Sequence, residues 1–545
     1  MTRNKTISRR DFIGVSAVGG AGLIGHNWLS HLSAAHAATN AATSGNASWV
    51  EATIPQLQAM MASGQITSRE LTKGYLQRID NLNPLLHAVI ETNPQAVSIA
   101  VGLDNERRAG YVRGPLHGIP VIVKDNIATD DTMQTTAGSL ALLNNHVPAD
   151  APLVAQLRAA GAIILGKANL SEWANWRGWD SISGWSARGG FTVCPYVLDD
   201  NPWGSSSGSA VAAAANLCAV AVGTETDGSI MAPSHANSAF GLKPTLGRIS
   251  GAGIIPIAHS QDTAGPMARS VTDGAILLGA LAGADPDDPI TKVGGLKGAP
   301  DYTRFLDPGG LRGARIGIPR KGLFGQSPAA DRLAEAAIEA LKNLGAVIVD
   351  PADIATVGEM DKSELDVLLH EFKADLNAYF ASLGPKAPVR SLADAIAFNE
   401  AHKDREMPYF GQEIFLQAEK KGPLTSRAYL DALAKNHRLS RAMGIDLTME
   451  KYTLDALVAP TSGPPSLTDL VNGDCGPGGS STIPAVAGYP HLTVPMGYVF
   501  GLPVGLSFFG RAWSEGRLIA LAYAFEQATR HRQGPRFLRT AELPA

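Results

Sequence analysis

The chain has 545 residues, of which 45% are hydrophobic and 18% are charged, enough to bury one large core or two ordinary ones. Its formal net charge of -4 gives no excess of Lys and Arg that would favour nucleic acid or an anionic membrane surface as a partner. Three cysteines, Cys194, Cys218 and Cys475, are too few for a disulfide framework and lack metal-ligand spacing, although one disulfide remains possible. We therefore expect a globular protein without a metal site.

The first residues have the pattern of an export signal. Residues 8–14 match the twin-arginine motif, and a mildly apolar stretch rich in Gly and Ala follows. An A-x-A pattern at residues 35–37 predicts cleavage directly after it. We expect residues 1–37 to be a twin-arginine export signal, and the mature protein to be periplasmic or secreted without stable membrane association. The alternative, an N-terminal membrane anchor, is disfavoured because polar residues interrupt the stretch.

A G-x-G-x-x-G sequence at residues 20–25 matches the dinucleotide-binding fingerprint in its letters only. That fingerprint needs a strand before it, a helix after it and an acidic residue about twenty positions further on. Here the sequence lies inside the export signal, and Glu51 is the first acidic residue after it. Nucleotide binding is therefore not expected.

After a polar spacer, helical patterns alternate with short apolar runs. Helices are predicted at residues 53–64, in a segment that Thr67 or Ser68 can cap, and at residues 151–161. Strands buried on both faces are predicted at residues 121–123, 162–165 and 219–222. This alternation favours an α/β fold with one large, mostly parallel or mixed β-sheet flanked by helices.

The sequence changes character at residues 360–451, which are charged, helix-forming and poor in strand signals. Strand-like sequence returns at residues 457–459 and 492–495, and residues 515–530 form an amphipathic helical pattern. Both halves of the chain therefore contribute strands to the sheet, and no linker separates two domains. We predict a single domain over residues 45–545 with a helical insertion at residues 360–451.

The serine-rich segment at residues 202–210 runs directly into an alanine helix pattern and has three rival interpretations. A phosphate cradle is disfavoured because the segment has no lysine. A nucleophile elbow with Ser206 at its centre needs an apolar strand upstream, but the preceding residues are polar and broken by proline. The third interpretation is a flexible Gly/Ser turn that caps the helix.

Two further segments carry candidate catalytic side chains. Ser229 follows a glycine in a tight loop behind the predicted strand at residues 219–222, and Lys124 directly follows five apolar residues. Lysines seldom end buried runs. Taken singly, however, Ser229 reads as an ordinary turn serine and Lys124 as a solvated lysine at a strand end.

Together, the segments at residues 118–126, 204–209 and 223–230 resemble the three motifs of the amidase signature family. The resemblance continues through residues 241–245 and 262–269 and covers essentially the whole mature chain. It implies the mixed-sheet fold of that family and hydrolysis of carboxamides without a cofactor.

The resemblance also implies a Ser-Ser-Lys triad in which Ser229 is the nucleophile, Ser205 the proton relay and Lys124 the general base. A cis peptide bond is expected at Gly204–Ser205. The backbone N–H groups of Thr226, Asp227, Gly228 and Ser229 are expected to bind the oxyanion, and Ser206 is a further candidate for substrate contact.

The chemistry explains why these residue types occur together. A lysine acts as a base only when neutral, so its pKa must fall from about 10.4 towards 7, and burial behind an apolar strand lowers it. A hydroxyl both donates and accepts a hydrogen bond, so a second serine can pass a proton between the lysine and the nucleophile.

Within the family, the chain resembles bacterial peptide amidases at residues 169–175, 183–190 and 459–464, so the C-terminal amide of a peptide is the expected substrate. Two departures affect the region of the acyl pocket: Trp203 stands where a glycine is common, and Met231 where many members have arginine. A broad-specificity amidase or aryl acylamidase is the alternative enzyme. An amidotransferase subunit that acts with tRNA is disfavoured by the export signal, and an inactive amidase-like binding module by the intact triad.

Other chemistry-bearing residues have open roles. Five tryptophans near the serine loop either line a substrate cleft or pack in the core: Trp173, Trp176, Trp179, Trp185 and Trp203. His117, His235 and His259 form no metal pattern and are expected to be structural or supporting. The sequence does not fix side-chain preference, peptide length, oligomeric state or whether the insertion covers the site.

Overall fold

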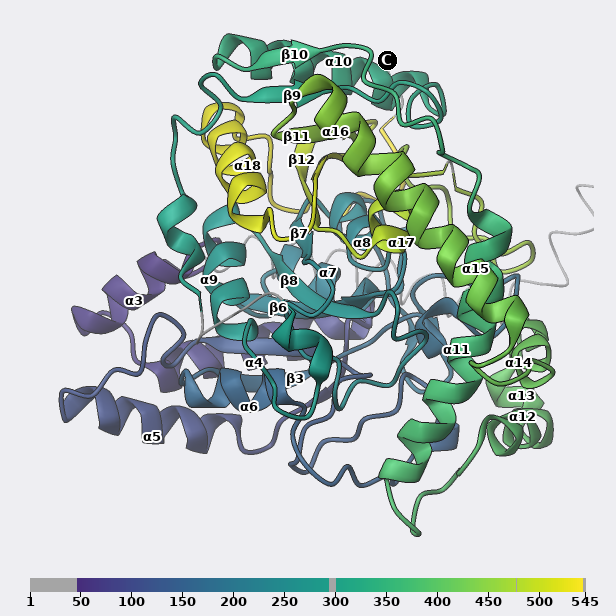
Figure 1. Ribbon diagram of the computed structural model, residues 1–545. Helices are drawn as coiled ribbons and strands as arrows, with labels where there is room; N and C mark the ends of the chain where they lie inside the picture. The colour runs from purple at the N-terminus through teal and green to yellow at the C-terminus, as the bar shows by residue number, and fades with distance from the viewer. Residues whose placement is uncertain (1–46, 294–299, 477, 543–545) are drawn as a thin grey trace, which may run out of the picture. The chain divides into compact units, whose positions relative to one another are not determined.

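The computed structural model describes residues 47–293, 300–476 and 478–542 (Figure 1). The predicted export signal at residues 1–37 lies outside the described residues. From Ser48 onward the chain forms one compact unit. In the part that the structure describes, no helix combines the length and the apolar character needed to cross a membrane.

The core of this unit is an eleven-stranded sheet. Its strands, in spatial order, are β1 (Val89–Thr92), β3 (Ile163–Ala168), β2 (Pro120–Lys124), β6 (Val220–Glu225), β8 (Thr263–Ala268), β7 (Phe240–Lys243), β12 (His491–Val499), β13 (Leu502–Phe509), β11 (Ala456–Pro460), β9 (Arg315–Gly317) and β10 (Val347–Val349). β2 pairs in parallel with both β3 and β6, and β9 pairs in parallel with both β10 and β11. The remaining pairs are antiparallel, so the sheet is mixed.

The predicted strands are confirmed, and the reason lies in their burial. Every residue of β2, β3 and β6 is buried, as expected for strands that helices cover on both faces. The pairing of β7 with β12 joins the two halves of the chain, because His491 lies opposite Lys243. A separate hairpin is formed by β4 (Trp185–Ser186) and β5 (Gly190–Phe191).

The helices outside the predicted insertion are α3 (Ile54–Ala62), α4 (Ser68–Leu86), α5 (Ala96–Arg108), α6 (Pro152–Ala159), α7 (Ser207–Ala214), α8 (Met231–Ala236), α9 (Val271–Leu281), α10 (Pro328–Asn343), α17 (Thr482–Ala487) and α18 (Glu515–Thr529). Short 3-10 turns are η1 (Leu140–Leu142), η2 (Glu172–Asn175), η3 (Pro289–Lys292) and η4 (Tyr302–Phe305). Thr67 caps α4 in a reciprocal capping box with Glu70.

Between residues 360 and 451 the described elements are all helical: α11 (Asp361–Ser382), α12 (Leu392–Ala401), α13 (Lys403–Glu406), α14 (Glu413–Glu419), α15 (Arg427–His437), the π-helical η5 (Arg438–Ile445) and α16 (Asp446–Tyr452). In Figure 1 these green helices lie together along one side of the sheet. Phe372, Leu376 and Phe380 of α11 share a buried cluster with Leu170 and Trp173. The insertion therefore packs directly on the segment that precedes the serine loop.

Candidate active site

The sheet brings two predicted motifs together. β2 and β6 are parallel neighbours, with Val123 opposite Val222, so both strands end at the same edge of the sheet. Lys124 is the last residue of β2, and β6 leads into residues 226–229, which we call the 226–229 loop. The lysine and the candidate nucleophile are thus placed by rigid, buried backbone.

Lys124 is completely buried, and its ammonium nitrogen faces oxygen atoms only. Its Nζ lies 2.8 Å from Ser205 Oγ, 2.9 Å from Ser206 Oγ, and 3.0 and 3.2 Å from the hydroxyl and carbonyl oxygens of Thr224. Burial lowers the pKa of Lys124 to about 7, although the negative charges of Glu225 and Asp262 act to raise it. The lysine is therefore half neutral near neutral pH.

The serine loop enters the site through a cis peptide bond at Gly204–Ser205, which confirms the expectation from the family resemblance. A Cβ atom at Gly204 would lie 2.1 Å from Ser171 Oγ, so any larger residue there would displace the Ser171 side chain. The residues before this loop form turns and bridges and no strand, which rules out a nucleophile elbow.

Ser206 is not placed as the exposed nucleophile that an elbow motif would require. It is fully buried, accepts a hydrogen bond from Lys124, and its Oγ lies 3.0 Å from the Thr224 carbonyl oxygen and 3.2 Å from the Thr224 nitrogen. Its N–H donates to the carbonyl of Ser229 at 3.1 Å. These contacts fix the lysine and the 226–229 loop relative to each other.

The 226–229 loop presents unused donors. Among the hydrogen bonds of the described residues, none uses the N–H groups of Thr226, Asp227, Gly228 or Ser229. Gly228 has a φ of 76°, a left-handed conformation that glycine adopts without strain. The next two N–H groups, of Ile230 and Met231, donate to the buried Glu225 carboxylate at 2.7 and 3.0 Å.

Ser229 is 8% exposed, whereas Ser205 is fully buried. Among the described hydrogen bonds, none joins the two serine hydroxyls directly. The structure thus brings Lys124 and Ser205 into contact and links Ser229 to them through the backbone of Ser206.

A cavity of about 260 Å³ opens beside the two serine segments. Gly204 and Gly228, the residues before the two serines, lie in its wall. The rest of the lining is mostly polar but includes the apolar side chains of Met231 and Ala232 and the indole of Trp203; its polar members include Asn175, Ser183, Asp227, Asp474 and Ser481. A larger cavity of about 680 Å³ reaches Asn126 and residues 224–226, with isoleucines 249, 254, 255 and 257 in its wall.

Four of the five tryptophans have one of the two predicted roles. Trp173 and Trp185 are buried in core clusters, and Trp176 packs against one of them. Trp203 lines the smaller cavity, and Trp179 is 49% exposed.

The three cysteines are free, so no disulfide forms among them.

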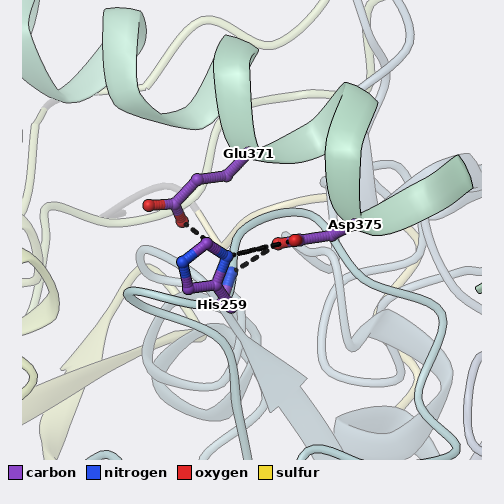
Figure 2. Close-up of side chains that lie close together, drawn as sticks. All are labelled: His259, Glu371 and Asp375. Carbon is purple, nitrogen blue, oxygen red and sulfur yellow. Dashed lines mark hydrogen bonds and ion pairs between the residues drawn. The ribbon is translucent and has the colours of Figure 1, made fainter. Parts of the chain in front are cut away.

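The histidines have structural contacts. His117 is buried with Nε2 3.0 Å from the Leu103 carbonyl, and His235 accepts a hydrogen bond from the Gly505 N–H. His259 lies beside the carboxylates of Glu371 and Asp375 on α11 (Figure 2). Sequence reasoning missed this cluster, because His259 precedes both carboxylates by more than a hundred residues.

The His259, Glu371 and Asp375 ligand atoms lie within 4.8 Å of one another, close enough to suggest a cation site. Every carboxylate oxygen is already engaged, however. Glu371 accepts from the Tyr429 hydroxyl and the Ser260 N–H, and Asp375 accepts from the ring and backbone of His259. The cluster is accordingly an ion pair with its hydrogen bonds satisfied.

Comparison with known proteins identifies the family of the chain. The family model described as Amidase matches residues 70–519. The chain belongs to the amidase family. A probable amidase of Arabidopsis thaliana is 45% identical over 498 residues, which cover 90% of this chain and 92% of the plant protein.

Two solved structures of this amidase family are also similar. The native peptide amidase from Stenotrophomonas maltophilia has 52% sequence identity and a TM-score of 0.86, covering 90% of this chain and 99% of that one. An amidase family protein from Bacillus anthracis has 38% identity and a TM-score of 0.81, covering 89% and 92% of the two chains. The chain is therefore a hydrolase that acts on amide bonds, and it has the mixed-sheet amidase fold expected from its motifs.

Proposed function

We propose that this amidase removes the C-terminal amide of peptides through an acyl-enzyme on Ser229. The observation that carries the proposal is the fully buried Lys124, with Nζ 2.8 Å from Ser205 Oγ and a pKa lowered to about 7. A dry lysine with its pKa lowered this far is suited to accept a proton from a hydroxyl at hydrogen-bond distance.

In the proposed mechanism, neutral Lys124 accepts the proton of the Ser205 hydroxyl, while Ser205 takes the proton of Ser229. The Ser229 oxygen then attacks the amide carbon. The oxyanion is bound by N–H groups of the 226–229 loop, which have no other partner among the described hydrogen bonds. The same path returns a proton to the leaving nitrogen, ammonia departs, and water hydrolyses the ester by the reverse transfer.

Two observations support a peptide amide as the substrate. The solved peptide amidase from Stenotrophomonas maltophilia is 52% identical over almost the whole domain. The smaller cavity has Gly204 and Gly228, the residues that precede the two serines, in its wall, so an acyl group bound there would lie beside both serine segments. Its polar lining offers partners for the amide groups of a peptide backbone.

The test compares one peptide carrying three different C-termini: a primary amide, an N-methylamide and an anilide. Purified protein should convert the primary amide to the free acid and release ammonia in equal amounts, as measured by mass spectrometry and an ammonia assay. The Ser229→Ala variant is the control and should do neither. Faster turnover of the anilide would favour an aryl acylamidase, and no turnover of any of the three would refute the proposed substrate class.

We further propose that the protein is exported through the twin-arginine pathway, on the basis of the arginine pair at residues 9 and 10. Replacing both arginines with lysine should leave uncleaved protein inside the cell, as seen by fractionation and mass spectrometry. Cleavage and export that continue in the double variant would refute this route.

A further inference from the structure

Thr226, the first residue of the 226–229 loop, is held at two points by consecutive residues of another segment. Its hydroxyl donates to Oδ1 of Asp262, and its carbonyl accepts from the Gln261 side chain at 3.3 Å. These two contacts restrict rotation of the Thr226 backbone. They consequently limit the directions in which the N–H groups of the loop point.

Asp262 is itself fixed in place. The carboxylate is partly buried, and its second oxygen accepts the N–H groups of Ile257 and Ala258 at 2.7 and 2.9 Å. These bonds close residues 257–262 into a compact turn, which we call the 257–262 loop. Burial raises the pKa of Asp262 to about 7, although its three donors oppose that shift.

Helix α11 of the insertion holds the outer side of the 257–262 loop (Figure 2). The N–H groups of His259 and Ser260 donate to Asp375 and Glu371, each at 2.9 Å, and Gln261 donates to Glu364 at 2.9 Å. Residues 364, 371 and 375 are spaced by seven and four positions, so they share one face of the helix. The imidazole of His259 adds a contact of 2.8 Å to Asp375.

We infer that Asp262 is a positioning residue for catalysis: it orients Thr226, and through it the oxyanion-binding N–H groups, while α11 holds the 257–262 loop in place. The chain of contacts runs from α11 through the 257–262 loop to Thr226 without a gap. The inference rests on the proposed role of the 226–229 loop in binding the oxyanion. It gives the helical insertion a part in stabilising the transition state.

The test starts with Thr226→Val, which keeps the shape of the side chain and removes the hydroxyl. We expect kcat on a peptide amide to fall about tenfold or more with KM little changed, because an oxyanion donor acts mainly in the transition state. Thr226→Ser restores a hydroxyl and should recover most of the lost rate. Asp262→Asn should lower kcat in the same way, and the double variant Thr226→Val with Asp262→Asn should be no worse than the more damaged single variant.

A second measurement separates positioning from a general loss of structure. A peptide aldehyde adds to the serine and places an oxygen where the oxyanion forms, whereas the product acid does not. The variants should lose affinity for the aldehyde in proportion to kcat and should bind the product acid normally, with unchanged melting temperature. Equal loss of affinity for both ligands, or additive effects in the double variant, would overturn the inference.

The Ser229 and Thr226 variants distinguish a failure of this inference from a failure of the proposed function. If Ser229→Ala is inactive and Thr226→Val retains full kcat, only the positioning role is wrong. If Ser229→Ala retains activity, the proposed nucleophile is wrong regardless of the behaviour of Thr226.

Discussion

Replacing Lys124 with methionine should abolish amide hydrolysis while making the protein more stable at acidic pH. Methionine has a similar length and fills the same buried space, but it cannot accept a proton. Lowering the lysine pKa from 10.5 to about 7 costs the fold about 5 kcal/mol at pH 7 and below. The variant removes this cost. It also leaves the oxygens around Nζ without a donor, and this loss reduces the gain in stability by about 1–3 kcal/mol.

The decisive quantity is the difference in unfolding free energy between Lys124→Met and the wild type, measured as a function of pH. Between pH 7 and 10.5 the unfolded chain binds the Lys124 proton and the folded protein does not, so the stability of the wild type rises with pH in that range. The advantage of Lys124→Met should be largest below pH 7. It should shrink by about 1.4 kcal/mol for each pH unit above it.

Urea denaturation of both proteins at several pH values, followed by fluorescence, measures this difference. The wild-type kcat/KM should also rise about tenfold per pH unit below pH 7 and level off above it, because the neutral lysine is the active form. If both proteins show the same pH dependence of stability, Lys124 is not neutral in the folded state, and the proposed base is wrong.

Four further variants test the serines of the site and one buried ion pair. Ser229→Ala should form no acyl-enzyme with a peptide amide, as seen by intact mass after rapid acid quenching; a trapped adduct would point to a different nucleophile. Ser205→Ala should lower kcat by about a hundredfold or more, and Ser206→Ala by less, because we expect only Ser205 to carry the proton; the reverse order in steady-state assays would exchange their roles. Arg177→Met should destabilise the fold by about 3–5 kcal/mol because it leaves the buried Glu172 carboxylate, now 3.0 Å from Arg177, without its charge partner. A melting temperature equal to that of the wild type would show that this ion pair contributes little.

The sequence predicted the fold and the three motifs because each depends on a local pattern. Short runs of residues that are apolar on both sides mark β2, β3 and β6, and the lysine behind one such run is buried as expected. The glycine at position 204 and the cis bond after it follow from a motif of contiguous residues.

The remaining features depend on contacts between distant segments. Ser206 sits at the centre of an elbow-like motif, yet its hydroxyl faces Lys124 because β2 and the start of α7 pack together. The hydroxyl of Thr224 joins the same site from β6, and its pattern in the sequence gave no sign of that contact. The pairing of His259 with Glu371 and Asp375 depends on how the insertion docks, and no local periodicity encodes that docking.

Part of the pocket wall comes from segments outside the catalytic motifs. Lys124 and Ser205 are held by buried backbone, whereas Asn175, Asp474 and Ser481 in the cavity wall come from other segments. A substitution at Asn175 or Asp474 changes what fits beside the serines without removing a group of the proton path, whereas Ser481 also contacts Asp227 of the 226–229 loop. Residues 175 and 474 are therefore suitable positions for a focused library aimed at other amides.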